Sequence, residues 1–260
     1  MRLLPALLMV AFTFTGLACS TQRVTLGKMG ADADFATCSK LSKRKKYDEA
    51  IECLELYKSR YAGTATATEA DVEIADTFFD QKDFLLAAES YDSFLRDHPL
   101  HARADYAFFR LGLSYLRSTP KAIDRDQEHL DDAIQALQSQ LQLFPESAHR
   151  AAAGDALEEA LNKIARHHFY VGEFYYRTGE YRAAVPRLAE VVQHHSEFPE
   201  IGKAFYLLTS ALAHLEEFDA ARDLYSKMTA TLDGTPWAKR TARCLRRATK
   251  SAEATDEEKP

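Results

Sequence analysis

The sequence predicts an all-α fold, an α-solenoid of about five stacked helix pairs with a last helix covering the end. Apolar residues recur at spacings of three and four from Ala31 to about residue 247, and no alternating strand pattern competes. One pattern also repeats: an aromatic residue or leucine precedes an alanine by three positions, and a large apolar residue follows it by four. Repeats of this size are typical of stacked-repeat proteins. The alanines are Ala50, Ala87, Ala133, Ala184 and Ala221, separated by 37, 46, 51 and 37 residues.

The helical periodicity divides the chain into helix pairs joined by short polar turns. Two of the pairs end at Pro99 and Pro145, because proline cannot continue a helix. A final helix begins at 235–236, where a hydroxyl N-cap precedes proline at the first helical position, and it runs to about residue 249 as a polar cap on the stack. The predicted pairs are 32–43 with 47–60, 67–80 with 84–97, 102–117 with 127–143, 148–178 with 181–195, and 200–215 with 218–231.

The beginning of the chain has the features of an export signal. One basic residue precedes an apolar run that is too short to cross a membrane, and small residues follow. Residues 16–19 resemble the bacterial lipobox, which implies that Cys19 is lipidated and becomes the new N terminus. Ser20 fits transfer to the outer membrane. The expected organisation is a signal peptide at 1–18, a lipid-anchored tether at 19–30, the solenoid at 31–249 and a charged, disordered acidic tail at 250–260.

Composition argues against nucleic-acid binding and against catalysis. The net charge is −6, whereas nucleic-acid binding needs a net basic surface or a basic stripe, so no nucleic-acid partner is expected. No catalytic motif with a defined spacing occurs. The adjacent histidines at 167–168 and 194–195 point about 100° apart on a helix, so neither pair can clamp one metal from one face. We therefore expect no enzyme activity, no catalytic residue, no metal site and no cofactor.

Cys38 and Cys53 fall on the two antiparallel helices of the first predicted pair, at heights that could face each other. An exported protein folds in an oxidising compartment, so a disulfide between them is allowed. Packing as two small apolar side chains is the favoured interpretation. The sequence leaves the disulfide open.

Small residues mark where the helices of a pair cross closely. Gly172 precedes Ala184 by 12 residues, and a larger side chain at either place would push the helices apart. This chain is similar to the tetratricopeptide repeat (TPR) in its order of residue types: a small residue, two aromatic residues, an alanine, a large apolar residue and a proline. That resemblance implies a right-handed superhelix with a concave groove.

More specific features resemble the BamD (ComL/YfiO) family over roughly residues 30 to 230. They are the lipoprotein signal, an insertion at 118–126 in the third repeat, and the aromatic segment 169–181 in the fourth. The resemblance implies an outer-membrane lipoprotein of the β-barrel assembly machine, anchored by acyl chains in the inner leaflet and facing the periplasm. It further implies binding to a POTRA domain of the barrel subunit BamA, to other Bam lipoproteins and to unfolded outer-membrane protein clients. The alternative is another periplasmic TPR lipoprotein, a secretin pilotin or a coordinator of envelope synthesis, and the insertion favours the first hypothesis.

Candidate binding residues follow from counting along the first helix of each pair. Aromatic residues beside charges suit an extended peptide, because rings give contact area and polar groups fix its orientation. The alternative for Phe109 and Leu113 is packing against the next helix. The predicted client-binding groove consists of Val72, Asp76, Phe79 and Asp80 in the second repeat and Tyr106, Phe109, Leu113 and Arg117 in the third.

Arg187 in the fourth repeat matches an arginine that, in the BamD family, lies in the part that meets BamA. Arginine suits interfaces because it keeps its charge and makes forked hydrogen bonds. The alternative is an exposed charge that contributes only to solubility. The long predicted helix at 148–178 is expected to bridge the two halves of the solenoid.

Overall fold

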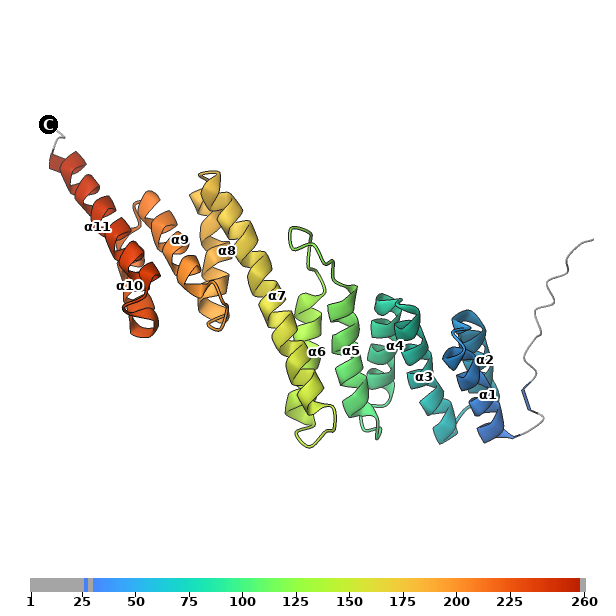
Figure 1. Cartoon of the computed structure of the whole chain (residues 1–260). Helices are drawn as coiled ribbons and strands as arrows, with labels where there is room; N and C mark the ends of the chain where they lie inside the picture. The colour runs from blue at the N-terminus through green and yellow to red at the C-terminus, as the bar shows by residue number, and fades with distance from the viewer. Residues whose placement is uncertain (1–25, 28–29, 258–260) are drawn as a thin grey trace, which may run out of the picture.

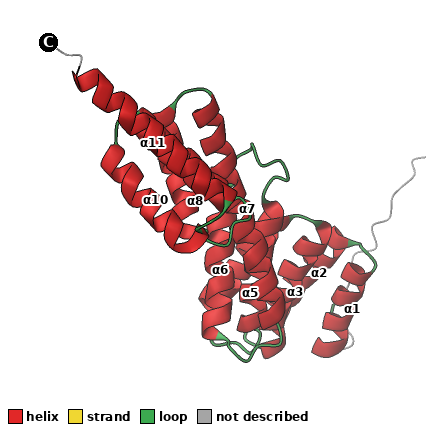
Figure 2. Cartoon of the chain, turned by 60° about the vertical axis from the view of Figure 1, so that its left-hand side comes forward, coloured by secondary structure: helices red, strands yellow, loops and turns green. Residues whose placement is uncertain are grey.

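The protein is an all-α solenoid of the TPR type, as a computed structural model that describes residues 26–27 and 30–257 shows. Within those residues the regular elements are all helices (Figure 2). Each helix packs against its neighbours in the chain, so the molecule is elongated, with α1 and α11 at opposite ends (Figure 1). The helices are α1 (Ala31–Lys43), α2 (Tyr47–Arg60), α3 (Ala65–Gln81), α4 (Phe84–Asp97), α5 (Ala104–Ser118), α6 (Leu130–Leu143), α7 (Arg150–Arg177), α8 (Tyr181–His194), α9 (Ile201–His214), α10 (Phe218–Leu232) and α11 (Pro236–Glu257).

The predicted pairs agree with the observed ones, and the C-terminal end differs. Helix α11 continues to Glu257, so the prediction of a disordered tail is wrong for residues 250–257. Alanine and glutamate favour helix, and no glycine or proline interrupts this stretch. The signal peptide, Cys19 and most of the tether lie outside the described residues. At the end of the tether, Leu26 is buried against the first helix pair.

Cys38 of α1 and Cys53 of α2 form a disulfide, with their Cα atoms 5.4 Å apart. The favoured prediction, two unbridged cysteines packed as apolar groups, is wrong. Both residues are buried, because the antiparallel hairpin places them at the same height between the helices. The bond therefore fixes α1 to α2 inside the first core.

The predicted insertion forms an ordered loop between α5 and α6 that rests on α7. Its buried Gln127 amide donates hydrogen bonds to the carbonyl oxygens of Ala122 and Arg125, at 3.1 and 3.0 Å. His167 Nδ1 of α7 lies 2.8 Å from the carbonyl oxygen of Ile123. These contacts hold the loop against the long helix.

Helix α7 has 28 residues and takes part in two hydrophobic cores, which confirms that it bridges the two halves. Its first part, with Ala153 and Ala160, packs in a cluster with residues of α5 and α6. Its second part, with Ala165 and Phe169, packs with α8 and α9. In the part of the chain that the structure describes, no helix combines the length and the apolar character needed to cross a membrane.

Glycine brings α7 and α8 into close contact. A Cβ atom added to Gly172 would lie 2.7 Å from Cγ of the fully buried Leu188, a distance that requires the helices to shift. Ala184 is also fully buried. In contrast, a Cβ atom on Gly154, in the same helix, would meet no atom within 4 Å.

Gly172→Ala and Gly154→Ala are therefore expected to change stability in opposite directions. Overpacking costs about 1–3 kcal/mol and should outweigh the helix-propensity gain at Gly172, so this variant melts at a lower temperature. At Gly154 the helix-propensity gain of about 0.5–1 kcal/mol is not offset by any steric clash, so that variant melts at a higher temperature. Thermal denaturation followed by circular dichroism checks both. Equal shifts of the two variants would contradict the close crossing at Gly172.

Candidate functional site

Helices α3 and α5 carry complementary charged stripes. Acidic residues on α3 recur at 69, 73, 76 and 80, and basic or aromatic residues recur at 103, 106, 110 and 117 on and just before α5, with Leu113 on the same face. Spacings of three and four place each set on one helix face. Arg103 bridges the two faces, with Nη1 3.2 Å from Glu69 Oε2 and Nη2 3.4 Å from Asp76 Oδ2.

Asp76 is the centre of a network that draws on three helices. The Tyr106 hydroxyl donates a hydrogen bond of 2.6 Å to Asp76 Oδ1, and the buried Tyr91 hydroxyl of α4 donates a second bond to the same oxygen. Arg110 Nε lies 3.5 Å from Asp76 Oδ1 and donates to the Tyr91 hydroxyl at 3.0 Å. We call these five residues the Asp76 cluster: Asp76, Tyr91, Arg103, Tyr106 and Arg110.

Burial and charge fix the protonation states in the Asp76 cluster. Burial raises the pKa of Tyr91 and of Tyr106 well above the ordinary tyrosine value, and the Asp76 charge raises it further. Burial acts to lower the pKa of Arg110, but Tyr91, Tyr106 and Asp76 outweigh it, so this pKa is raised. Both tyrosines are therefore donors and Arg110 stays charged at neutral pH.

Aromatic rings lie against the arginines of the Asp76 cluster. The Arg110 guanidinium lies 3.7 Å from the ring centroid of Phe79, and that of Arg103 lies 4.5 Å from the centroid of Tyr106. Stacking on rings holds a guanidinium in place and limits its rotation. The site thus presents preorganised charge and aromatic surface, which suits binding of a polypeptide.

The eight predicted groove residues have different environments. Asp76, Phe79 and Tyr106 come together as described, and Asp80 is exposed on the next turn of α3. Val72 is fully buried in the core between α3 and α4, so the prediction that it faces a groove is wrong. Val72 lies one helical turn before Asp76, but α3 packs against both α2 and α4, so a residue with this spacing can be buried in the core.

The other three predicted groove residues contact the next helix pair. Phe109 stacks on His149, with the ring centroids 5.7 Å apart. Leu113 packs against the core that α5 shares with α7, and Arg117 Nη1 lies 2.6 Å from Glu159 Oε1 of α7. Phe109 and Leu113 keep part of their surface exposed.

Sequence reasoning missed Tyr91, Arg103 and Arg110. The spacing of Arg103, Tyr106 and Arg110 already placed them on one face with the predicted residues. No sequence pattern linked Tyr91 to these residues, because Tyr91 lies on the second helix of its pair. Its ring was assigned only to the repeat pattern, as the large apolar residue that follows Ala87 by four positions.

Arg187 is exposed on α8, and its side chain contacts α7. Its Nη1 lies 3.3 Å from His168 Nδ1. Burial lowers the pKa of His168, and the Arg187 charge lowers it further, so His168 is neutral at pH 7 and can accept this hydrogen bond. Along α7, the exposed side chains of Tyr170 and Phe174 lie one turn apart.

Pockets of about 780 and 610 Å³ are among those in the C-terminal half. Neither is lined by a predicted groove residue or by Arg187. Among the described residues, no group of three or more histidine, cysteine, aspartate or glutamate side chains could hold a metal ion.

Comparison with known proteins gives a match along most of the solenoid. Residues 31–227 match the YfiO family, described as outer membrane lipoprotein. The chain is 24% identical over 204 residues to the outer membrane protein assembly factor BamD of Neisseria meningitidis serogroup B, covering 74% of this chain and 76% of that protein. The protein of the same name in Vibrio cholerae is 23% identical over 180 residues, covering 66% and 75% of the two chains. The one in Caulobacter vibrioides is 20% identical over 208 residues, covering 79% and 68%.

Proposed function

Since the chain belongs to the YfiO family of outer membrane lipoproteins, we propose that it is a scaffold of the β-barrel assembly machine. In this role it binds a BamA-type barrel subunit and unfolded outer-membrane protein clients. The observation that carries the proposal is the family match over residues 31–227, which includes both candidate binding regions. Several relatives that align along the same solenoid are named outer membrane protein assembly factors.

The proposed client-binding surface is formed by α3 and α5. It includes the partly exposed members of the Asp76 cluster together with Asp80, and Val72 is excluded because it is buried. The fixed charges can orient an extended client segment, while the rings supply contact area. The remaining residues of this surface are Phe79, Phe109, Leu113 and Arg117.

The proposed contact with the BamA-type subunit includes Arg187, for which an acidic side chain of a POTRA domain would be a fitting partner. Arg187 is exposed, so a partner can reach it. Its hydrogen bond with neutral His168 orients the guanidinium without neutralising its charge, which also supports this role. Helix α7 connects this region to the client surface. A client held on α3 and α5 would thus stay near the barrel subunit at a raised effective concentration.

Co-purification from detergent-solubilised envelopes tests the contact with the barrel subunit. Arg187→Glu should reduce recovery of the BamA-type subunit by about tenfold or more, because truncating or reversing one charge of a desolvated pair commonly costs 2–5 kcal/mol. Arg182→Glu, on the same helix and also exposed, is the matched control and should keep recovery unchanged. Capture of a secretin in place of a BamA-type barrel would reject the proposed function in favour of a pilotin.

The proposed lipid anchor is Cys19, which would hold the protein on the periplasmic face of the outer membrane. Cys19→Ala should release the protein from the membrane fraction, since it removes the acyl chains that bind the bilayer. Cys244→Ala, which changes a half-buried thiol of α11, should leave the protein in that fraction. Fractionation and immunoblotting measure both. Full retention of Cys19→Ala would mean that the anchor lies elsewhere.

A further inference from the structure

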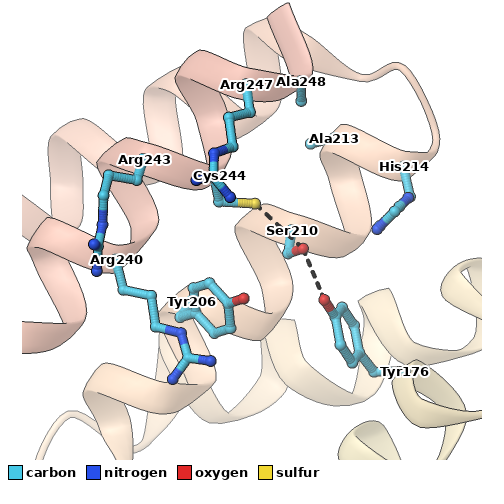
Figure 3. Close-up of a pocket in the computed structure, with 10 residues that line it drawn as sticks. All are labelled: Tyr176, Tyr206, Ser210, Ala213, His214, Arg240, Arg243, Cys244, Arg247 and Ala248. Carbon is cyan, nitrogen blue, oxygen red and sulfur yellow. Dashed lines mark hydrogen bonds between the residues drawn. The ribbon is translucent and has the colours of Figure 1, made fainter. Parts of the chain in front are cut away.

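A basic pocket with a volume of about 780 Å³ lies between α9, α11 and the C-terminal end of α7 (Figure 3). Arg240, Arg243 and Arg247 of α11 line one side of it. Their spacing of three and four residues places them on one helix face. Tyr206 of α9 and Tyr176 of α7 supply aromatic surface to the same pocket.

The three arginines of the pocket have no acidic partner among the side chains that the structure describes. Other exposed arginines, such as Arg182 and Arg246, also lack an ion pair within the described part of the chain, but they do not line this pocket, whereas Arg103, Arg117 and Arg222 lie within ion-pair distance of carboxylates. Like charges three and four residues apart on a helix repel each other. Three guanidinium groups gathered along one side of a pocket without a carboxylate partner suit an anionic ligand, because arginine makes forked, charge-assisted bonds to carboxylates and phosphates.

The walls of the pocket favour a ligand larger than a single ion. The Arg240 guanidinium lies 4.9 Å from the Tyr206 ring centroid, so aromatic and basic surfaces are combined. The Ser210 hydroxyl is 2.8 Å from the Tyr176 hydroxyl and 3.4 Å from Cys244 Sγ, so these polar groups already have partners. A space of this volume accommodates several residues of a peptide, whereas a free phosphate would fill a small part of it.

We propose that this pocket binds an acidic segment of a polypeptide partner. Its carboxylates pair with Arg240, Arg243 and Arg247, and its backbone lies against Tyr206. Helices α9 and α11, which supply most of the pocket lining, lie towards the end of the solenoid opposite α1 (Figure 1). A protein ligand is chosen over a lipid headgroup because the proposed anchor at Cys19 would hold the α1 end next to the membrane. Binding at this pocket would not require either of the partners proposed above.

Fluorescence anisotropy with the purified full-length protein tests the pocket directly. The probe is fluorescein-labelled hexaglutamate, with hexaglutamine as the uncharged peptide control. The wild type should bind hexaglutamate and not hexaglutamine, and the affinity should fall as salt screens the charges. Changing both Arg243→Gln and Arg247→Gln should weaken binding about tenfold or more, since two charge-assisted contacts are lost.

Arg246→Gln is the matched control, because Arg246 is exposed on the same helix but does not line this pocket. It should change affinity by less than about twofold, and circular dichroism should show that all variants are folded. Equal binding of the two peptides, or an equal loss in Arg246→Gln, would overturn the proposal. So would arginine-dependent binding to vesicles containing phosphatidylglycerol without binding to hexaglutamate, which would assign the pocket to a lipid headgroup.

Discussion

Replacing Asp76 with alanine is expected to lower the free energy of unfolding by about 3 kcal/mol, because a largely buried charge loses its partner. The Arg110 side chain is only 15% exposed and would keep only the Tyr91 hydroxyl as an acceptor. Tyr91, fully buried, and Tyr106 would both lose the oxygen to which they donate. For a chain of this size the melting temperature should fall by roughly 6–12 °C.

The control for this prediction is Asp80→Ala, one turn further along α3. Asp80 is exposed, and such surface changes usually alter stability by less than about 0.5 kcal/mol. Differential scanning calorimetry of the wild type and both variants gives the comparison. If Asp76→Ala melted together with Asp80→Ala, the Asp76 cluster would not stabilise the packing of α3 on α5.

Removal of the disulfide is expected to have an effect of similar size. The sequence separation of Cys38 and Cys53 is 15 residues, and closing a loop of this length stabilises a protein by about 3 kcal/mol in the chain-entropy account. Cys38→Ala combined with Cys53→Ala should lower the melting temperature accordingly. Alanine is chosen because both sites are buried and a serine hydroxyl would add an unpaired polar group.

Reduction of the wild type gives an independent test of the bond. Dithiothreitol should lower its melting temperature towards that of the double variant and leave the double variant unchanged. Cys244→Ala should respond to the reductant as the wild type does, since Cys244 is a free cysteine. A wild-type melting curve that is insensitive to reductant, with free thiols at both positions, would show that the bond is absent in solution.

The position of the disulfide has a structural reason. In a solenoid each repeat is stabilised mainly by its neighbours, and among the described residues the first repeat packs on one neighbouring repeat, the second. Helix α1 packs on α2 and, more lightly, on α3. The covalent bond and the buried Leu26 add to this limited contact area. The bond therefore stabilises the packing of α1 on α2.

The fold was predictable because its determinants are local. Periodicity of three and four residues gave the helices, and prolines and polar turns gave most of their ends. The alanines and Gly172 marked the helix crossings, since only small side chains allow that approach. The prediction was wrong beyond residue 249, because charge suggested disorder while helix-forming residues continue α11.

The site could be predicted only in part. The stripe of Asp76 and Asp80 on one helix and that of Tyr106 and Arg117 on another follow from helical spacing. Helical spacing does not determine which of these residues contact each other. Val72 has the same spacing and is buried, while Arg117 forms an ion pair with Glu159 of α7. The three pocket arginines recur at spacings of three and four residues in the last helix, but nothing in the sequence indicates which residues lie opposite them.

The sequence by itself determined the helices, their pairing and the family, because these depend on residues close together along the chain. The tertiary structure decided which charges are neutralised and which stay free. Asp76 gains its partners from α4 and α5, and Cys38 reaches Cys53, only when the helices are packed. The arginines of α11 line a pocket only because α7 and α9 lie opposite them. Contacts between residues far apart in sequence depend on packing distances and angles that a one-dimensional pattern does not contain.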